Sequence, residues 1–237
     1  MEHLTKNADL IFKTIHYFFS SERFASNAPF KGFLIHGPVG TGKTELVKQV
    51  ARRIGEELDS VNIKLVPVDS SVIASPKWGE SEQILQYLFS IVKGVDHDDT
   101  KIILLFDDLE SLLLARGTQA AREWHYSLNA VFFHLLDNMN PFRTIAVATT
   151  NRQDLMDAAV STRLYSIPIL NVPRSVLLKY ADESLGAMIG TSPKRQIILK
   201  DVESKLSKLA TPCIRDCRQI VIVSCIENRA LDNYSNG

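Results

Sequence analysis

The chain has 237 residues, of which 45% are hydrophobic, so it is long enough for one large domain with a smaller companion. Basic and acidic residues balance at 27 each, which indicates no general attraction to nucleic acid or to a membrane surface. No apolar run reaches the roughly 18 residues that a membrane span needs. The first residues lack the form of a secretory signal, and the three cysteines lie near one predicted helix without a disulfide framework. We therefore expect a cytoplasmic protein.

A glycine-rich stretch lies between two predicted elements. Residues 32–36 are typical of a short buried strand, and residues 46–54 carry a helical apolar face. The spacing between them is G-x-x-x-x-G-K-[ST], in which glycines let backbone N–H groups point at phosphate oxygens. The lysine brings a positive charge to the β and γ phosphates, and the hydroxyl can bind Mg²⁺. The predicted phosphate loop consists of Gly37, Pro38, Val39, Gly40, Thr41, Gly42, Lys43 and Thr44.

Strands and helices alternate up to Pro173, which predicts an α/β fold with a parallel five-stranded sheet sandwiched by helices. Beyond Pro173 only helical patterns remain, so we expect a small all-helical lid. The expected parts are an N-terminal helix and linker (1–30), a large α/β subdomain (31–173) and the lid (174–237). Further strands are expected at 61–68, 101–108, 144–148 and 165–170, and helices at 10–19, 82–93, 128–139 and 175–189, at 201–209 with Asp201 as its cap, and from Thr211-Pro212 onward.

Two carboxylates end the strand expected at residues 101–108. Asp107 is placed to hold Mg²⁺, and Asp108 is placed to orient or deprotonate an attacking water. The alternative is a pair of helix-capping aspartates in a turn. The phosphate loop upstream favours the catalytic interpretation, because ligands of α/β sheets bind at the carboxyl ends of the strands.

With these motifs and four further stretches, the sequence resembles the AAA+ ATPases, and more narrowly their AAA clade. The order and spacing of the motifs make the resemblance specific. The four stretches are Lys77-Trp78-Gly79-Glu80-Ser81-Glu82, similar to a first pore loop; Thr150-Asn151, similar to sensor 1; the segment from Asp157 to Arg163, similar to one that ends in an arginine finger; and Arg215, similar to sensor 2.

The resemblance implies an ATP-hydrolysing homo-hexamer with Mg·ATP bound between subunits. Asn151 would contact the attacking water or the γ phosphate, and Arg163 would stabilise the transferred phosphoryl group of the neighbouring subunit. Arg215, or Arg218 one turn later, would reach the phosphates from the lid. The alternative for Arg163 is a surface salt bridge, and for the lid arginines a solvated helix face. A client polypeptide would be gripped by the pore loop formed by Lys77, Trp78 and Gly79.

Two departures from the family pattern bear on activity. The usual acidic pair is Asp-Glu, but here Asp108 stands in the second position and is one methylene shorter. Many clade members carry two arginines in the finger segment, whereas this chain has only Arg163. Slow turnover or a tuned switch is therefore an open alternative.

Within the clade, the sequence resembles the pachytene-checkpoint remodellers, which act on HORMA-domain proteins. Compact bacterial relatives of that group occur in anti-phage signalling systems. We therefore expect an ATP-dependent remodeller with a HORMA-domain client. The alternatives are a slowly hydrolysing switch or scaffold and, less favoured by the neutral charge, a DNA-associated factor. The resemblance rests on Ile35-His36-Gly37-Pro38, Lys77-Trp78, Leu109-Glu110-Ser111-Leu112, Ala115-Arg116 and the single-arginine segment.

Overall fold

The structure is a computed structural model that describes residues 5–73, 79–94, 99–114, 123–228 and 230. The chain divides into two compact units. The first comprises Lys6–Gly37 and Lys43–Ile169, and the second comprises chiefly residues beyond Leu170 together with the loop Pro38–Gly42. The expected limits of 31–173 and 174–237 stay a prediction.

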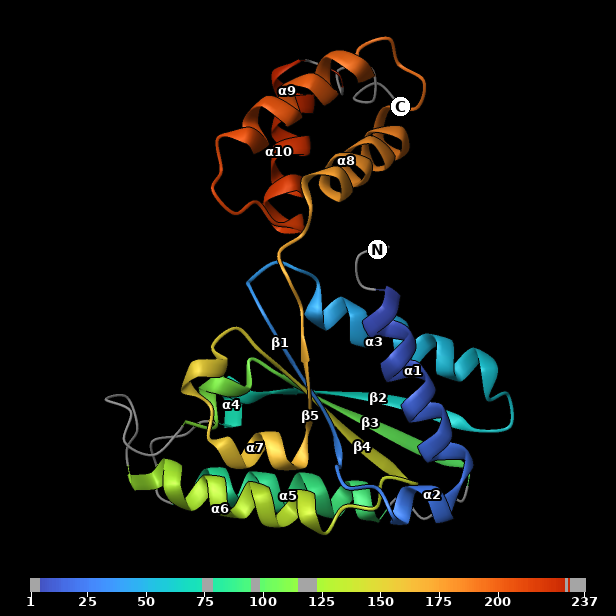
Figure 1. Ribbon diagram of the computed structural model, residues 1–237, viewed down its shortest axis with the longest axis vertical. Coiled ribbons are helices and arrows are strands. Elements are labelled where there is room, and N and C mark those ends of the chain that lie inside the picture. The colour runs from blue at the N-terminus through green and yellow to red at the C-terminus, as the bar shows by residue number, and fades with distance from the viewer. Residues whose placement is uncertain (1–4, 74–78, 95–98, 115–122, 229, 231–237) are drawn as a thin grey trace. The chain divides into compact units, whose positions relative to one another are not determined.

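A five-stranded sheet, all of it parallel, forms the centre of the first unit (Figure 1). The strand order is β2-β3-β4-β1-β5, so β1 lies between β4 and β5, and β3 lies between β2 and β4. The carboxyl ends of all strands therefore meet at one edge of the sheet. This confirms the predicted parallel sheet, whose strands are β1 (Gly32–His36), β2 (Asn62–Asp69), β3 (Thr100–Asp107), β4 (Thr144–Thr150) and β5 (Tyr165–Pro168).

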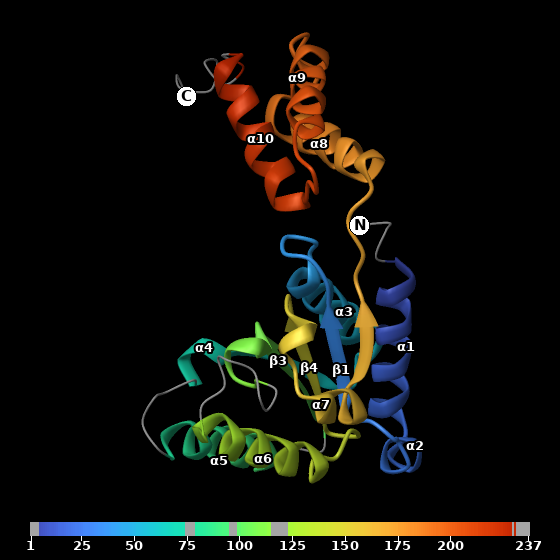
Figure 2. The same ribbon diagram turned by 60° about the vertical axis from the view of Figure 1, so that its left-hand side comes forward.

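Helices cover both faces of the sheet. In Figures 1 and 2, α1 and α3 lie on one side of it, and α5, α6 and α7 lie on the other. The predicted sandwich is thus confirmed. The helices are α1 (Thr5–Ser20), α2 (Glu22–Ser26), α3 (Lys43–Glu57), α4 (Ser70–Ile73), α5 (Glu80–Lys93), α6 (Glu123–Asp137) and α7 (Ala158–Arg163), with short 3-10 turns η2 (Leu109–Ser111) and η3 (Gln153–Leu155).

Strand β3 is buried along nearly its whole length, as its apolar run predicts. Alternate residues Ile102, Leu104 and Phe106 belong to one apolar cluster with side chains of α5 and α6. The ring of Phe106 meets Phe132 edge to face, with centroids 5.2 Å apart. This packing fixes the last residues of β3 and so places Asp107 at the carboxyl end of the sheet.

The helices of the second unit are α8 (Arg174–Ile189), α9 (Arg195–Ser207) and α10 (Ile214–Glu227). They pack on one another around an apolar core, which confirms the predicted all-helical character of this region. Among the described residues of either unit, no helix is both long and apolar enough to cross a membrane.

Two expected helix starts are wrong. Asp201 does not cap α9 but lies inside it, because the helix begins at Arg195 and the Asp201 carboxylate pairs with Lys205 one turn on, at 2.7 Å. Helix α10 begins at Ile214 instead of Pro212. Its cap is Cys213, whose backbone N–H donates to the Asp216 carboxylate at 2.9 Å, so a carboxylate three residues on fixes the start.

Candidate functional site

The glycine-rich loop has the left-handed backbone that its sequence predicts. Gly37 has φ 148° and Gly42 has φ 93°. A Cβ atom on Gly37 would lie 2.1 Å from the carbonyl oxygen of Ile169, so only glycine fits there. Within the loop, the Thr41 hydroxyl donates to the Pro38 carbonyl at 2.9 Å. The loop conformation thus depends on the glycines of the motif.

Lys43 is the first residue of α3 and is buried, with only 6% of its surface exposed. Its Nζ donates to the Gly37 carbonyl at 2.9 Å and to Oδ1 of Asn151 at 2.6 Å. A buried ammonium needs such oxygen partners, because an unpaired charge is costly away from water. Lys43 therefore joins the start of the loop to the end of β4.

The hydroxyl of Thr44 meets the first carboxylate of the acidic pair. Thr44 Oγ1 donates to Asp107 Oδ1 at 2.9 Å, and the hydroxyl of Thr149 also donates to that oxygen. A hydroxyl and a carboxylate side by side are hard oxygen ligands of the kind that Mg²⁺ prefers. The donor set of Thr44 and Asp107 therefore fits a magnesium ion.

Asp108 turns the chain away from β3. It has φ 50° and, among the described residues, is the only residue other than glycine with a left-handed backbone. Its Oδ1 accepts from Nδ2 of Asn151 at 2.9 Å. Burial, together with the negative charges of Glu110 and Asp107, raises the pKa of the Asp108 carboxyl. A raised pKa makes this carboxylate a stronger base, which suits proton transfer from water.

Sequence reasoning gave no place in the site to two residues, Thr149 and Glu110. Besides contacting Asp107, the Thr149 hydroxyl accepts from the backbone N–H of Asp108 at 3.2 Å. Oε1 of Glu110 accepts from the backbone N–H of Asn151 at 3.1 Å. The pairing of Phe106 with Ala148 in the sheet sets Thr149 opposite Asp107. Finding Thr149 would therefore require the strand order as well as the motif.

Arg163, at the end of α7, lies in an ion pair with its own chain. Its Nε and Nη2 donate to the two carboxylate oxygens of Asp137 in α6, each at 2.8 Å. The guanidinium also lies 4.9 Å from the centroid of the Phe133 ring. The structure thus joins Lys43, Thr44, Asp107, Asp108 and Asn151 by hydrogen bonds and ties Arg163 elsewhere. The trans role of Arg163 stays a prediction.

The other predicted residues lie in other elements or outside the described residues. Arg215 and Arg218 both lie on α10 with exposed side chains. Gly79 is the cap of α5, with φ 77°, and no described residue other than its chain neighbours lies within 4 Å of the position where a Cβ would stand. The other two predicted pore-loop residues, Lys77 and Trp78, lie outside the described residues. Their role stays a prediction.

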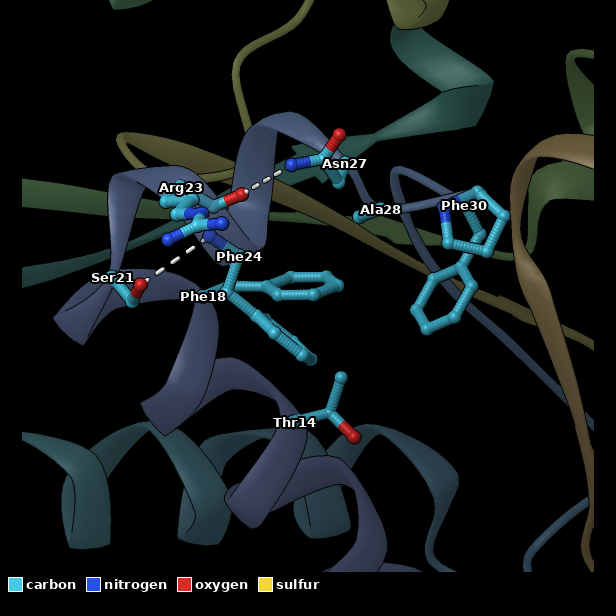
Figure 3. Close-up of a pocket in the computed structure, with 9 residues that line it drawn as sticks. Thr14, Phe18, Ser21, Arg23, Phe24, Asn27, Ala28 and Phe30 are labelled. Carbon is cyan, nitrogen blue, oxygen red and sulfur yellow. Dashed lines mark hydrogen bonds between the residues drawn. The ribbon is translucent and has the colours of Figure 1, made fainter.

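A cavity of about 550 Å³ lies where α1 and α2 lead toward β1. Figure 3 shows the rings of Phe18 and Phe24 facing Phe30 across it, with Thr14 below. Phe30 precedes β1, so this cavity lies toward the amino ends of the strands, whereas the polar network lies at their carboxyl ends. It is therefore separate from the candidate nucleotide site.

A parallel sheet in this order, with a glycine loop leading into a helix and an acidic strand end beside it, defines the class of P-loop nucleotide hydrolases. Residues 33–171 match the family described as "ATPase family associated with various cellular activities (AAA)". This match covers more than half of the chain. The chain belongs to the AAA ATPase family, and membership implies ATP binding and hydrolysis.

Relatives of similar sequence include proteins described as "AAA ATPase forming ring-shaped complexes". The one from Bifidobacterium adolescentis is 30% identical over 140 residues, covering 59% of this chain and 27% of the relative. The one from Corynebacterium efficiens is 27% identical over 134 residues, covering 56% of this chain and 26% of the relative. The matched region thus spans about a quarter of the length of these relatives.

Among solved structures, a chain in "Structure of E. coli MS115-1 HORMA:CdnC:Trip13 complex" has a similar fold, with a TM-score of 0.75. The match covers 95% of this chain and 82% of that chain, at 18% sequence identity. At this identity the likeness concerns the fold. It shows that the arrangement of sheet and helices is one that a solved structure also contains.

Proposed function

We propose that this protein is an ATP-driven protein remodeller that works as a hexameric ring. The observation that carries the proposal is the hydrogen-bonded network at the carboxyl edge of the sheet, in which Lys43, Asn151 and Asp108 are linked and Thr44 meets Asp107. The description of relatives as ring-forming supports assembly. The fold shared with a chain of a HORMA-containing complex supports a HORMA-domain client.

In this proposal each residue has one task. Lys43 binds the β and γ phosphates, and Thr44 and Asp107 hold Mg²⁺. When bound, the ion neutralises charge on the phosphate oxygens. Asp108 accepts a proton from water that Asn151 helps to orient. Arg163 stabilises the phosphoryl group bound to the neighbouring subunit, and Arg215 contacts the phosphates from the lid. The pore loop of Lys77, Trp78 and Gly79 grips the client.

The second candidate is a nucleotide-dependent switch that hydrolyses slowly, and the short side chain of Asp108 favours it. Replacing Asp108 with Glu extends the carboxylate by one methylene. If the switch is correct, Asp108→Glu raises ATP turnover by about 10-fold or more, since a well-placed general base contributes 10²–10⁴-fold. If the protein is a remodeller, Asp108→Glu should change ATP turnover by less than about 3-fold, because the native Asp108 carboxylate is then already placed to accept a proton from water.

A client trap tests the remodeller directly. Asp108→Asn keeps an oxygen that can accept from Nδ2 of Asn151 but loses the base, so we expect it to bind ATP and hold its client. The variant is recovered from native cells with ATP present, and mass spectrometry identifies what it holds. Asp108→Asn with Trp78→Ala is the control. A HORMA-fold protein that is held only when Trp78 is present supports the proposal, whereas a catch independent of Trp78 contradicts threading.

A further inference from the structure

Glu110 lies in η2, the short turn that begins directly after the left-handed residue Asp108. This left-handed turn ends the extended path of β3 and brings Glu110 beside the end of β4. There its Oε1 accepts from the backbone N–H of Asn151 at 3.1 Å. The side chain therefore contacts the strand end that carries Asn151, from a turn that also carries Asp108.

The other oxygen of Glu110 is unusual. Oε2 is buried and has no hydrogen-bond partner among the described residues. A buried carboxylate oxygen without a partner lowers stability, because the group has lost water without a replacement. A side chain that served packing alone would not need a carboxylate here. The acceptor that it offers to Asn151 is a reason for an acidic or amide side chain at this position.

Asn151 is held at three points. Its Nδ2 donates to Asp108 at 2.9 Å, its Oδ1 accepts from Lys43 at 2.6 Å, and its backbone N–H donates to Glu110. The side-chain contacts can form together only if the backbone of residue 151 stays in place. Among these contacts, the Glu110 bond is the one that acts on the backbone.

We propose that Glu110 is a positioning residue, which fixes the backbone of Asn151 so that its carboxamide spans Lys43 and Asp108 during ATP hydrolysis. This inference rests on the proposed function. Glu110 does not act as a second base, because one of its oxygens accepts from Asn151 and the other is buried away from water. It acts on the reaction through Asn151.

The experiment measures ATP turnover and ATP affinity in Glu110→Ala, Glu110→Gln, Asn151→Ala and the double variant Glu110→Ala/Asn151→Ala. We expect Glu110→Ala to lower kcat about 10-fold with an ATP Kd within about 3-fold of the native value, because positioning affects the reaction more than binding. Glu110→Gln keeps an acceptor oxygen and should stay within about 3-fold of native turnover. The double variant should be no slower than Asn151→Ala alone, since residues that act as a unit are not additive.

Asp154→Ala is the matched control, because Asp154 is an exposed carboxylate in η3 that pairs with Arg152 instead of Asn151. It should leave turnover unchanged. Multiplicative losses in the double variant, native turnover in Glu110→Ala or Asn151→Ala, or a Glu110→Gln variant as slow as Glu110→Ala would each overturn the inference.

If Glu110→Ala fails to fold, as judged by its melting curve, Glu110→Asp replaces it in the same cycle. The shorter side chain keeps the charge but draws the acceptor away from Asn151, so we expect an intermediate loss that again disappears with Asn151→Ala. A native protein that binds but does not hydrolyse ATP would overturn the proposed function itself. A native protein that hydrolyses ATP with multiplicative losses would overturn only the role of Glu110.

Discussion

The two parts of the predicted catalytic machinery differ in how the chain holds them. At the carboxyl edge of the sheet, polar side chains from α3, from the end of β3 and from the residues that follow β3 and β4 contact one another through hydrogen bonds. At the end of α7, Arg163 contacts Asp137 of α6 and none of those residues. The first part is therefore arranged within one chain, whereas the proposed trans role of Arg163 would require it to exchange Asp137 for a phosphate group of the neighbouring subunit.

The ion pair between Arg163 and Asp137 is weak enough for such an exchange of partner. The side chains of Arg163 and Asp137 are 26% and 49% exposed, so solvent weakens their attraction, and the pair contributes about 1 kcal/mol or less. An arginine finger contributes about 10³–10⁵ in rate, or roughly 4–7 kcal/mol of transition-state stabilisation. Contact with a neighbour's nucleotide would therefore outweigh the ion pair.

The largest expected effect comes from Arg163→Ala. We expect kcat to fall about 1,000-fold under conditions that favour assembly, because in the proposed function Arg163 stabilises the charge of the transferred phosphoryl group. ATP affinity should change little, since Arg163 does not contact the phosphate-loop lysine. The measurement is steady-state turnover over a range of protein concentrations.

Arg152→Ala is the control for this experiment, because Arg152 also forms a two-point contact with an aspartate, Asp154, at an exposed position. It should keep native turnover. Full activity of Arg163→Ala would show that the ion pair with Asp137 is the whole role of this arginine.

Lys43→Ala should have the next largest effect. In the proposed function this charge binds two phosphates, so its loss should weaken ATP binding about 100-fold, as expected for two charge-assisted hydrogen bonds. Titration with a fluorescent ATP analogue measures this. Lys48→Ala, an exposed lysine on the same helix, should bind ATP as the native protein does. Equal affinities in the two variants would contradict the proposed site.

Thr149→Val tests the polar edge at a buried position. The substitution keeps the shape but leaves the Asp108 N–H and an Asp107 oxygen with one partner fewer. We expect the free energy of unfolding to fall by about 1–3 kcal/mol and turnover to fall about 10-fold. Chemical denaturation and an ATPase assay measure the two effects. Thr144→Val, at the amino end of the same strand, should leave turnover unchanged. If Thr144→Val lowers turnover as much as Thr149→Val does, the effect comes from packing in the strand and not from the hydrogen bonds of Thr149.

The smallest effect is expected from Asp137→Asn. Removal of this charge weakens the hold on Arg163, so turnover at a fixed protein concentration should rise about 2- to 5-fold, which corresponds to a pair worth less than 1 kcal/mol. The concentration at which turnover is half-maximal should fall as well. A loss of turnover would instead indicate that Asp137 keeps Arg163 in its working position. Asp154→Asn serves as the control.

Local sequence patterns predicted which segments form strands and helices better than they predicted where each helix begins. The sheet strands and the helix after the phosphate loop lie where periodicity places them, because each buries an apolar face that the sequence displays. The starts of α9 and α10 were wrong, because side chains three or four residues on, Lys205 and Asp216, decided which residues Asp201 and Cys213 contact. Such competition between partners is not visible in a single motif.

The amino-acid sequence alone predicts the phosphate loop, the acidic strand end and the alternation that leads to a parallel sheet. Each of these depends on residues close together in the chain. Only the tertiary structure placed Thr149 beside Asp107, Glu110 beside the backbone of Asn151, and Arg163 beside Asp137. The physical reason is that strand order and the packing of α6 on α7 join residues 26 to 42 positions apart. No local spacing encodes those distances.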